Sequence, residues 1–363
     1  MENQVKTPLI RLAKRTNMDP KKVWAIRPLS ILVALLLGCI PILLTGNNPF
    51  NAYKIIVQGS LSRPVYFKQT VKIAIPLLGC ALAIAPCFKM KFWNIGAEGQ
   101  ITMGAIAATY FGLFYGNKIP HLPLLIIMGL AGAVAGGLWA LIPAFFKAKW
   151  NTNETLFTLM MNYIAIGIVA WLQGGPWEGQ KGSQIIPKFA AGARLPNVFG
   201  IHCGWIIVLV LVVLMHIYMN KTKQGYEIAV IGDSVNTARY AGMNVGRIMM
   251  RTMFISGAIS GLVGFIVVSG ANYTLYKGVA NGVGFTSITV AWLSQLNAFA
   301  MILISMLLAI LTKGSNTLQT KLKIPASIAE IVTGILLFCM LSCEFFINYE
   351  IIFRHKEKKE VKE

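Results

Sequence analysis

Residues 122–142 read LPLLIIMGLAGAVAGGLWALI and contain no charged side chain. A helix rises 1.5 Å per residue, so a stretch of about 20 residues spans the hydrocarbon core of a bilayer, which is about 30 Å thick. This stretch therefore predicts a transmembrane helix. Seven other stretches are also predominantly apolar, at residues 29–46, 70–88, 101–116, 155–173, 204–219, 252–270 and 326–347.

The composition of the 363-residue chain supports a membrane protein. Hydrophobic residues make up 56% and charged residues 13%, whereas a soluble domain carries about 25% charged residues. The net charge of +20 does not indicate a nucleic-acid binder, because the basic residues lie between long apolar runs. The fold class predicted is an all-α polytopic membrane helical bundle. Six cysteines without a CxxC pair indicate buried thiols, and we predict neither a metal nor a cofactor.

A further apolar stretch, residues 284–312, has an unusual length. As one helix it measures about 43 Å, which is long for one span and short for two. Asn297 lies near its middle. A broken or re-entrant pair of half-helices fits this length best, and it brings the expected total to about ten transmembrane segments.

The basic residues predict the orientation and three regions. Residues 1–28 form a basic arm, residues 29–347 the transmembrane domain and residues 348–363 a charged tail. Positive loops stay in the cytoplasm, and the arm carries Lys6, Arg11, Lys14, Arg15, Lys21, Lys22 and Arg27. Alternation from there makes residues 220–251 the largest cytoplasmic loop and residues 174–203 the largest one outside. Charge alone leaves the side of the C-terminal tail open.

The chain has no sequence motif for ATP hydrolysis or metallopeptidase chemistry. It contains no G-x-x-x-x-G-K-[ST] phosphate loop and no H-E-x-x-H, and its four histidines are scattered. Transport is therefore a better hypothesis than catalysis.

The first polar motif is FWNIGAEGQ, residues 92–100, directly after the second predicted span. An ionisable residue at membrane depth costs about 2.5–3.5 kcal/mol on insertion scales, so it needs a partner or a wet surface. One interpretation is a polar lining or gate at an interrupted helix. The other is a cytoplasmic turn in which Glu98 caps the N-terminus of the next helix.

The second motif, VIGDSVNTARYAGM at residues 230–243, lies in the long cytoplasmic loop. Asp233 or Ser234 is suited to cap a short helix that Gly242 ends. Such a rigid, protruding helix is what an ATPase needs in order to grip a membrane partner. The alternative is a connecting loop with a stabilising turn.

Two more motifs begin or interrupt predicted helices. NTNETLFTLMMNYI, residues 151–164, opens the fifth span with Asn153 as its cap, and Asn162 lies about two turns deeper, where it predicts a hydrogen bond between helices. GVGFTSITVAWLSQLNAF, residues 282–299, is rich in glycine at its start. Paired Gly-interrupted segments in a transporter point to its pathway.

These four motifs, in this order, resemble the permease subunits of bacterial ABC importers of the ribose/galactose and nucleoside type. Those proteins carry F-N-I-G-x-E-G-Q after their second span. The third motif is similar to the longer permease of nucleoside systems whose receptor is a basic membrane lipoprotein. The second motif departs from the family at two points: Ser234 precedes Val235 and Asn236, so the usual Asn is in altered register, and Thr237 replaces the first Ala. The fourth departs from it at Trp292, Ser294, Ala298 and Ala300.

The resemblance implies a non-catalytic subunit of the cytoplasmic membrane that carries nucleosides, with both termini in the cytoplasm. It implies three partners: an ATPase subunit with two nucleotide-binding domains, a second permease that is a different chain, and a substrate-binding lipoprotein. Candidate residues for the translocation pathway are Phe92, Trp93, Asn94, Glu98, Gln100, Asn162, Phe285, Trp292 and Asn297. Candidate residues for coupling to the ATPase are Gly232, Asp233, Ser234, Asn236, Arg239, Tyr240, Ala241 and Gly242.

Three alternatives remain. A sugar permease of the ribose/galactose type shares the same motifs. An ion-coupled secondary transporter would use the membrane carboxylates Glu98, Glu330 and Glu344 as a proton relay, although interfacial carboxylates are the simpler explanation. A membrane enzyme is the most distant alternative.

Overall fold

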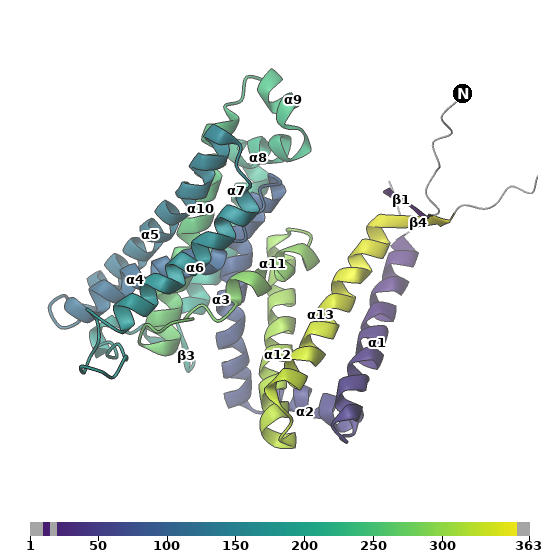
Figure 1. Cartoon of the computed structure of the whole chain (residues 1–363), viewed down its shortest axis with the longest axis horizontal. Coiled ribbons are helices and arrows are strands. Elements are labelled where there is room, and N and C mark those ends of the chain that lie inside the picture. The colour runs from purple at the N-terminus through teal and green to yellow at the C-terminus, as the bar shows by residue number, and fades with distance from the viewer. Residues whose placement is uncertain (1–9, 15–19, 354–363) are drawn as a thin grey trace, which may run out of the picture. The chain divides into compact units, whose positions relative to one another are not determined.

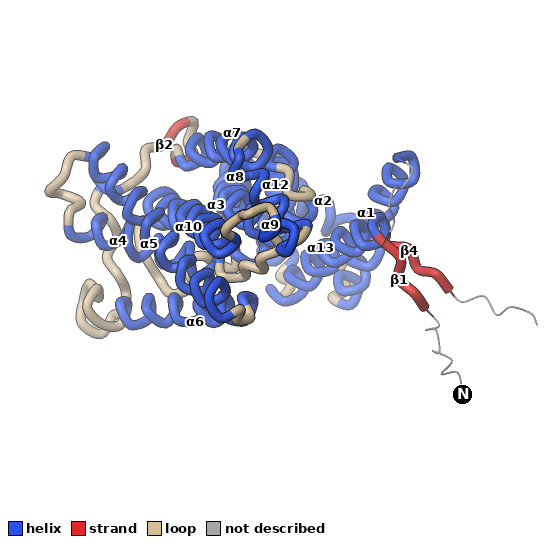
Figure 2. The backbone as a smooth tube through the Cα atoms, turned by 90° about the horizontal axis from the view of Figure 1, so that it is seen from above, coloured by secondary structure: helices blue, strands red, loops and turns tan. Residues whose placement is uncertain are grey.

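The computed structural model describes residues 10–14 and 20–353. The chain divides into two compact units, residues 1–54 with 318–363 and residues 55–317. Helices dominate both units, and the strands of the described residues form two short antiparallel pairs (Figures 1 and 2). This confirms the predicted all-α membrane fold.

The first unit is built on a pair of helices. α1 (Pro20–Leu44) packs against α13 (Ala326–Asn348). The strand before α1, β1 (Ile10–Lys14), pairs antiparallel with the strand after α13, β4 (Tyr349–Phe353). The two described ends of the chain therefore lie together at one end of this unit (Figure 1).

The second unit contains most of the helices. They are α3 (Pro64–Lys89), α4 (Ala97–Phe114), α5 (His121–Trp150), α6 (Glu154–Gln173), α7 (Gly204–Lys221), α8 (Lys223–Asp233), α9 (Val235–Tyr240), α10 (Val245–Ile266) with its π-helical extension η2 (Val267–Asn272), and α11 (Val283–Leu293). The loop before α7 carries the 3-10 turn η1 (Ala191–Ala193) and the hairpin of β2 (Asn197–Val198) and β3 (Ile201–His202). Two further helices, α2 (Pro49–Leu61) and α12 (Ala298–Leu322), have residues in both units.

The centre of the second unit is the contact among α4, α5 and α10. Gly132 and Gly136 on α5 face Gly257 and Gly261 on α10, and a Cβ at Gly136 would overlap the Gly257 carbonyl oxygen. Small residues four apart let two helix backbones approach closely, which is how helices associate where water provides no driving force. The spacing is visible in the sequence as G-x-x-x-G in both helices, and the sequence analysis missed it.

Six of the described helices are long and apolar enough to cross a membrane. They are α3, α5, α6, α7, α10 with η2, and α12. A seventh span results if Leu32–Leu44 and Pro49–Leu61, which meet at a bend of 108°, count as one. The predicted total of about ten segments is therefore not confirmed. α2 lies between the predicted spans 29–46 and 70–88; it was not predicted, because Lys54 and Gln58 interrupt its apolar residues.

The apolar stretch 284–312 is broken, as predicted, but not into two half-helices. α11 has 11 residues and ends at Leu293. Gln295 and Leu296 take left-handed backbone conformations, with φ of 51° and 60°. α12 then runs for 25 residues, past Thr312 to Leu322. The sequence analysis ended this stretch at Thr312, where the apolar run ends. α12 continues beyond it because polar residues such as Lys and Gln also favour the helix.

Candidate functional site

The chain between α3 and α4 forms an extended segment, residues 92–95, in which Phe92 and Asn94 are buried and Trp93 is exposed. Residues 92–95 carry no helical structure, and α4 begins at Ala97. In the interior of a membrane protein every backbone N–H and C=O needs a partner, because no water is there to supply one. The side chains around this segment provide those partners.

Asn162 of α6 provides two of them. Its side-chain oxygen accepts a hydrogen bond of 2.8 Å from the Gly99 N–H, and its nitrogen donates one of 3.0 Å to the Ile95 carbonyl. Thr158, one turn earlier on α6, accepts from the Ile95 N–H at 3.2 Å. Asn162 is 1% exposed, so α6 binds the extended segment through an amide that no solute contacts in this conformation.

Asn94 organises the segment from within. Its oxygen accepts from the Gly96 N–H at 3.0 Å and from the Gln100 side chain at 3.1 Å. Its nitrogen donates to the Ser256 hydroxyl on α10 at 3.3 Å. Asn94 and Gln100 are both buried. These contacts fix the turn from the extended segment into α4.

Glu98 joins the first polar motif to the fourth. One carboxylate oxygen accepts from the Gly282 N–H at 2.8 Å, and the other accepts from the Gly284 N–H at 2.7 Å. These N–H groups lie at the start of α11, where helix donors are otherwise unpaired. Gly282 has φ of 73°, and a Cβ at Gly284 would overlap the Glu98 backbone nitrogen, so both positions require glycine. The sequence analysis considered Glu98 as a pathway residue or as the cap of its own helix, α4; the residue does lie in the first turn of α4, and its carboxylate also caps α11.

Three aromatic candidates have the opposite environment. Trp93, Phe285 and Trp292 are 45%, 43% and 42% exposed. The indole rings of Trp93 and Trp292 stack with centroids 5.7 Å apart and planes inclined by 22°. The fourth exposed candidate, Asn297, caps α12 by accepting from the Phe299 N–H at 3.0 Å. Phe92, the ninth candidate, is buried.

The second motif, residues 230–243, contains the end of the short helix α8 and all of the short helix α9, which form a protruding corner (Figure 1). Ser234 caps α9 by accepting from the Thr237 N–H at 3.2 Å, and Gly242 ends the turn with φ of 73°. Both positions confirm the predicted capped helix. Tyr240 is 94% exposed. The Arg251–Glu227 ion pair, at 2.9 Å, holds α8 to α10.

The coupling candidates divide by exposure. Those exposed are Asp233, Asn236, Arg239, Tyr240, Ala241 and Gly242. Ser234 is half-buried, and Gly232 is buried against the end of α3, where a Cβ would overlap the Lys89 carbonyl oxygen. The motif thus has an exposed surface on α9 and a buried contact with α3 at Gly232.

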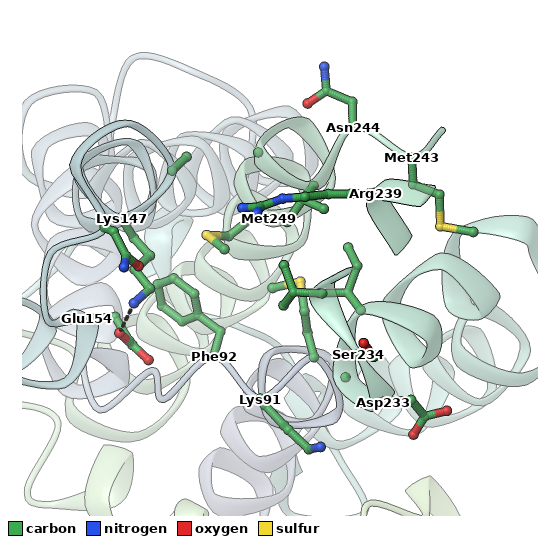
Figure 3. A pocket seen from close by; sticks show the side chains of 18 of the residues that line it. Lys91, Phe92, Lys147, Glu154, Asp233, Ser234, Arg239, Met243, Asn244 and Met249 are labelled. Atoms are coloured by element: carbon green, nitrogen blue, oxygen red, sulfur yellow. Dashed lines mark ion pairs between the residues drawn. The ribbon is translucent and has the colours of Figure 1, made fainter. Parts of the chain in front are cut away.

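A cavity of about 880 Å³ lies beneath this corner. The ends of α5 and α6 line it with the Lys147–Glu154 ion pair, at 3.0 Å. Figure 3 shows the Phe92 ring beside this pair, with Arg239 reaching across from α9. Four basic side chains and two acidic ones line the cavity: Lys91, Lys147, Lys149, Arg239, Glu154 and Asp233.

The sequence analysis missed several residues of these sites. Thr158 lies inside the third quoted motif, and its i+4 spacing from Asn162 on one helix face was the available signal. Ser256 and Phe88 lie in apolar stretches, and only the tertiary structure reveals their contacts. Within residues 10–14 and 20–353 no cluster of three His, Cys, Asp or Glu side chains is arranged to hold a metal ion.

These features define a helical membrane protein with interrupted helices at its centre and a protruding helical corner. The family described as branched-chain amino acid transport system / permease component matches residues 67–341. The chain belongs to this permease family.

Curated relatives align over most of the chain. The guanosine ABC transporter permease protein of Bacillus subtilis is 31% identical over 86% of this chain and 92% of its own length. The glucose ABC transporter permease protein of Haloferax volcanii is 29% identical over 89% and 88%. The nucleoside ABC transporter permease protein of Lactococcus lactis subsp. cremoris is 27% identical over 88% and 91%. No solved structure matches the chain.

The chain is therefore a multi-pass permease of the ABC transporter class. Permeases of this class work with an ATPase and a substrate-binding protein, and they are in general non-catalytic.

Proposed function

We propose that this chain is the membrane-spanning subunit of an importer that carries nucleosides across the bacterial cytoplasmic membrane, while a separate chain hydrolyses ATP. The observation that carries the cargo is the similarity to a guanosine permease and a nucleoside permease over 86% and 88% of the chain. The third sequence motif, around Asn162, points to the same branch.

The corner formed by α8 and α9 is the docking element for the ATPase. A transmembrane subunit without an ATP-binding motif needs a rigid cytoplasmic contact, and α9 is capped at Ser234, terminated at Gly242 and exposed at Tyr240. Asp233, Asn236, Arg239 and Ala241 complete its exposed surface. Gly232 supports this surface from behind.

Trp93, Phe285 and Trp292 line the pathway. A nucleoside has an apolar base and a polar sugar, and stacking of a base on an aromatic ring is worth about 1–3 kcal/mol. Asn297 lies at the break beyond α11 on the same segment as Trp292. The buried candidates Phe92, Asn94, Glu98, Gln100 and Asn162 act by holding the backbone that presents these aromatics.

Three partners complete the importer: an ATPase with two fused nucleotide-binding domains, a second permease that is a different chain, and a substrate-binding lipoprotein. Gentle solubilisation and purification through a tag on this chain should recover all three. Recovery of two copies of this chain without a second permease would instead identify a homodimer.

Both termini lie in the cytoplasm, with residues 1–28 as a basic arm, residues 29–347 as the transmembrane domain and residues 348–363 as a charged tail. The pairing of β1 with β4 supports this, because it places residues 10–14 and 349–353 at the same end of their unit. A cysteine introduced at Glu363 of the intact cell should resist a membrane-impermeant thiol reagent. Labelling from outside would place the tail on the other side.

The cargo is tested by uptake into proteoliposomes that contain the complete complex, with labelled uridine or guanosine and unlabelled competitors. We expect excess nucleoside to abolish uptake and excess ribose or glucose to leave it unchanged. A sugar is the second candidate, because the glucose permease relative covers 89% of the chain. Transport of glucose or ribose without transport of nucleosides would replace the proposal by that candidate.

The dependence on an ATPase is tested with Tyr240→Ala, at the 94% exposed tip of α9. We expect loss of ATP-driven uptake with unchanged thermal stability. Tyr163→Ala is the matched control, because Tyr163 is 64% exposed on α6, away from the corner. Robust uptake by the purified chain alone, driven by a proton gradient, would overturn the subunit proposal in favour of a secondary transporter.

A further inference from the structure

Three aromatic rings meet where the two interrupted segments come together. Trp93 comes from the extended segment before α4, and Trp292 comes from the last turn of α11. Behind them lies Phe88 of α3, whose ring centroid is 5.6 Å from that of Trp93 and 5.8 Å from that of Trp292. Phe88 is buried, whereas nearly half of each indole is exposed.

Interfacial tryptophans lie at the level of the lipid headgroups and need no partner ring. Here two indoles nearly 200 residues apart in sequence stack on each other and on a common buried ring. Each also lies beside non-helical backbone: Trp93 within an extended segment, and Trp292 three residues before the left-handed turn that begins at Gln295. Irregular backbone of this kind is tolerated in a membrane protein where other helices cover it or where it lines a cavity.

The stack lies at the end of α3 that meets the cytoplasmic corner. Ser287 on α11 bonds to Cys80 on α3 at 3.0 Å, so α11 follows α3 toward its C-terminal end, where Phe88 lies. Gly232 of α8 packs directly on the Lys89 carbonyl at that same end. A movement of α8 therefore acts on the backbone from which the extended segment begins.

Phe92 connects the corner to the stack. It is 2% exposed and belongs to a buried cluster with Ile231 of α8 and Ala238 of α9. Phe92 therefore packs with the helices of the corner, while Trp93, the next residue, packs in the stack with Phe88 and Trp292.

We propose that the Trp93–Trp292 stack is the gate that closes the cytoplasmic end of the pathway, and that the α8–α9 corner opens it by displacing Trp93 through Phe92. This inference rests on the proposed function, since it takes the corner to be the docking element for the ATPase. In the conformation described here the gate is closed. ATP-driven movement of α8 and α9 separates the indoles and lets a solute pass.

The gate is tested in proteoliposomes that contain the complete complex, by passive efflux of preloaded labelled nucleoside without ATP and by ATP-driven uptake. For the double variant Trp93→Ala/Trp292→Ala we expect passive efflux to rise about tenfold, the population change that loss of an aromatic stack produces. ATP-driven accumulation should be lost. Co-purification of the ATPase should be unchanged, which shows that the variant assembles.

Trp171→Ala is the matched control, because Trp171 is 67% exposed on α6, away from the stack. If the double variant has the same efflux and uptake as this control, the stack is not a gate. Uptake of nucleoside by the wild-type complex would still support the proposed function in that case. Wild-type complex that accumulates neither nucleoside nor sugar overturns the proposed function itself. If the cargo is a sugar, the same comparison is made with that sugar.

The connection through Phe92 is tested with Phe92→Leu, which keeps an apolar side chain in the cluster. We expect ATP hydrolysis by the complex to continue while uptake is lost, with passive efflux as low as in the wild type. Met253→Leu, in the same buried cluster but on α10, serves as the control. A proportional loss of hydrolysis and uptake in Phe92→Leu would overturn the role of Phe92 as the connection.

Discussion

Two sets of side chains on the same interrupted segments face opposite surroundings. Asn94, Glu98 and Asn162 are at most 5% exposed, and each bonds to backbone that no helix satisfies. Trp93 and Trp292 are more than 40% exposed, and their rings contact each other and Phe88. The difference indicates that a polar residue at membrane depth need not face a solute. Here the polar set holds the broken helices, and the aromatic set makes ring contacts at the surface.

Asn162→Leu should produce the largest loss of stability. It leaves the Gly99 N–H and the Ile95 carbonyl unpaired in a buried site. At about 1–3 kcal/mol for each group, the free energy of unfolding should fall by about 2–6 kcal/mol. Thermal unfolding of the purified protein in detergent measures this. Asn117→Leu, at an exposed loop position, should change stability by less than about 0.5 kcal/mol. Equal effects of the two variants would mean that the buried amide is not structural.

Glu98→Gln should have the next largest effect. The amide keeps one acceptor for the start of α11, but its NH₂ group faces the second glycine N–H. Loss of a charge-assisted hydrogen bond should cost about 1.5–3 kcal/mol. Glu330→Gln, at an exposed position on α13, provides the control, and both proteins are compared by their unfolding midpoints. If Glu98→Gln retained full stability but abolished uptake, Glu98 would belong with the pathway and not with the scaffold.

Much of this architecture was predictable because it depends on local sequence. Each predicted span overlaps a helix, since an apolar run of about 20 residues has few other structures available. The cap at Ser234, the end at Gly242 and the break near Asn297 also follow from side chains that favour those conformations.

The face on which each residue lies was not predictable. The hydrogen bond predicted between Asn162 and another helix is confirmed by its bond to Gly99 of α4, but its partners, more than 60 residues away, could not be named from the sequence. Nothing near Asn162 in the sequence reveals that the extended segment passes there. The joining of Glu98 to Gly284 spans 186 residues and likewise arises only when α4 and α11 meet.

His202 differs from the buried polar side chains described above, because it is buried without a polar partner among the described residues. It is 1% exposed in the hairpin before α7, and neither ring nitrogen has a hydrogen-bond partner among the described residues. Burial, with a smaller effect of the nearby Lys72 charge, lowers the pKa of His202 from 6.5 to about 4. The folded protein therefore keeps this ring neutral at pH values where the unfolded chain takes up a proton.

Stability should consequently fall as the pH drops below about 6.5 and level off below about 4. At pH 5 the loss attributable to His202 should be about 2 kcal/mol. Unfolding midpoints between pH 7 and pH 5 measure it, with His202→Gln as the comparison. The variant should show a shallower dependence on pH. An unchanged dependence would mean that other groups cause it.

Trp292→Ala should have the smallest effect on stability of the four changes and a large effect on transport. Its ring is 42% exposed and is held by stacking with Trp93 and Phe88, so its loss should cost about 0.5–1.5 kcal/mol. ATP-driven uptake by the complex should nevertheless be impaired, because Trp93 then has no second indole with which to form the proposed gate. Unfolding midpoints and uptake rates, measured on the same preparation, test both halves. Trp171→Ala should leave uptake unchanged. If Trp292→Ala instead destabilised the protein as strongly as Asn162→Leu, the aromatic set would be part of the scaffold, and the two regions would share one role.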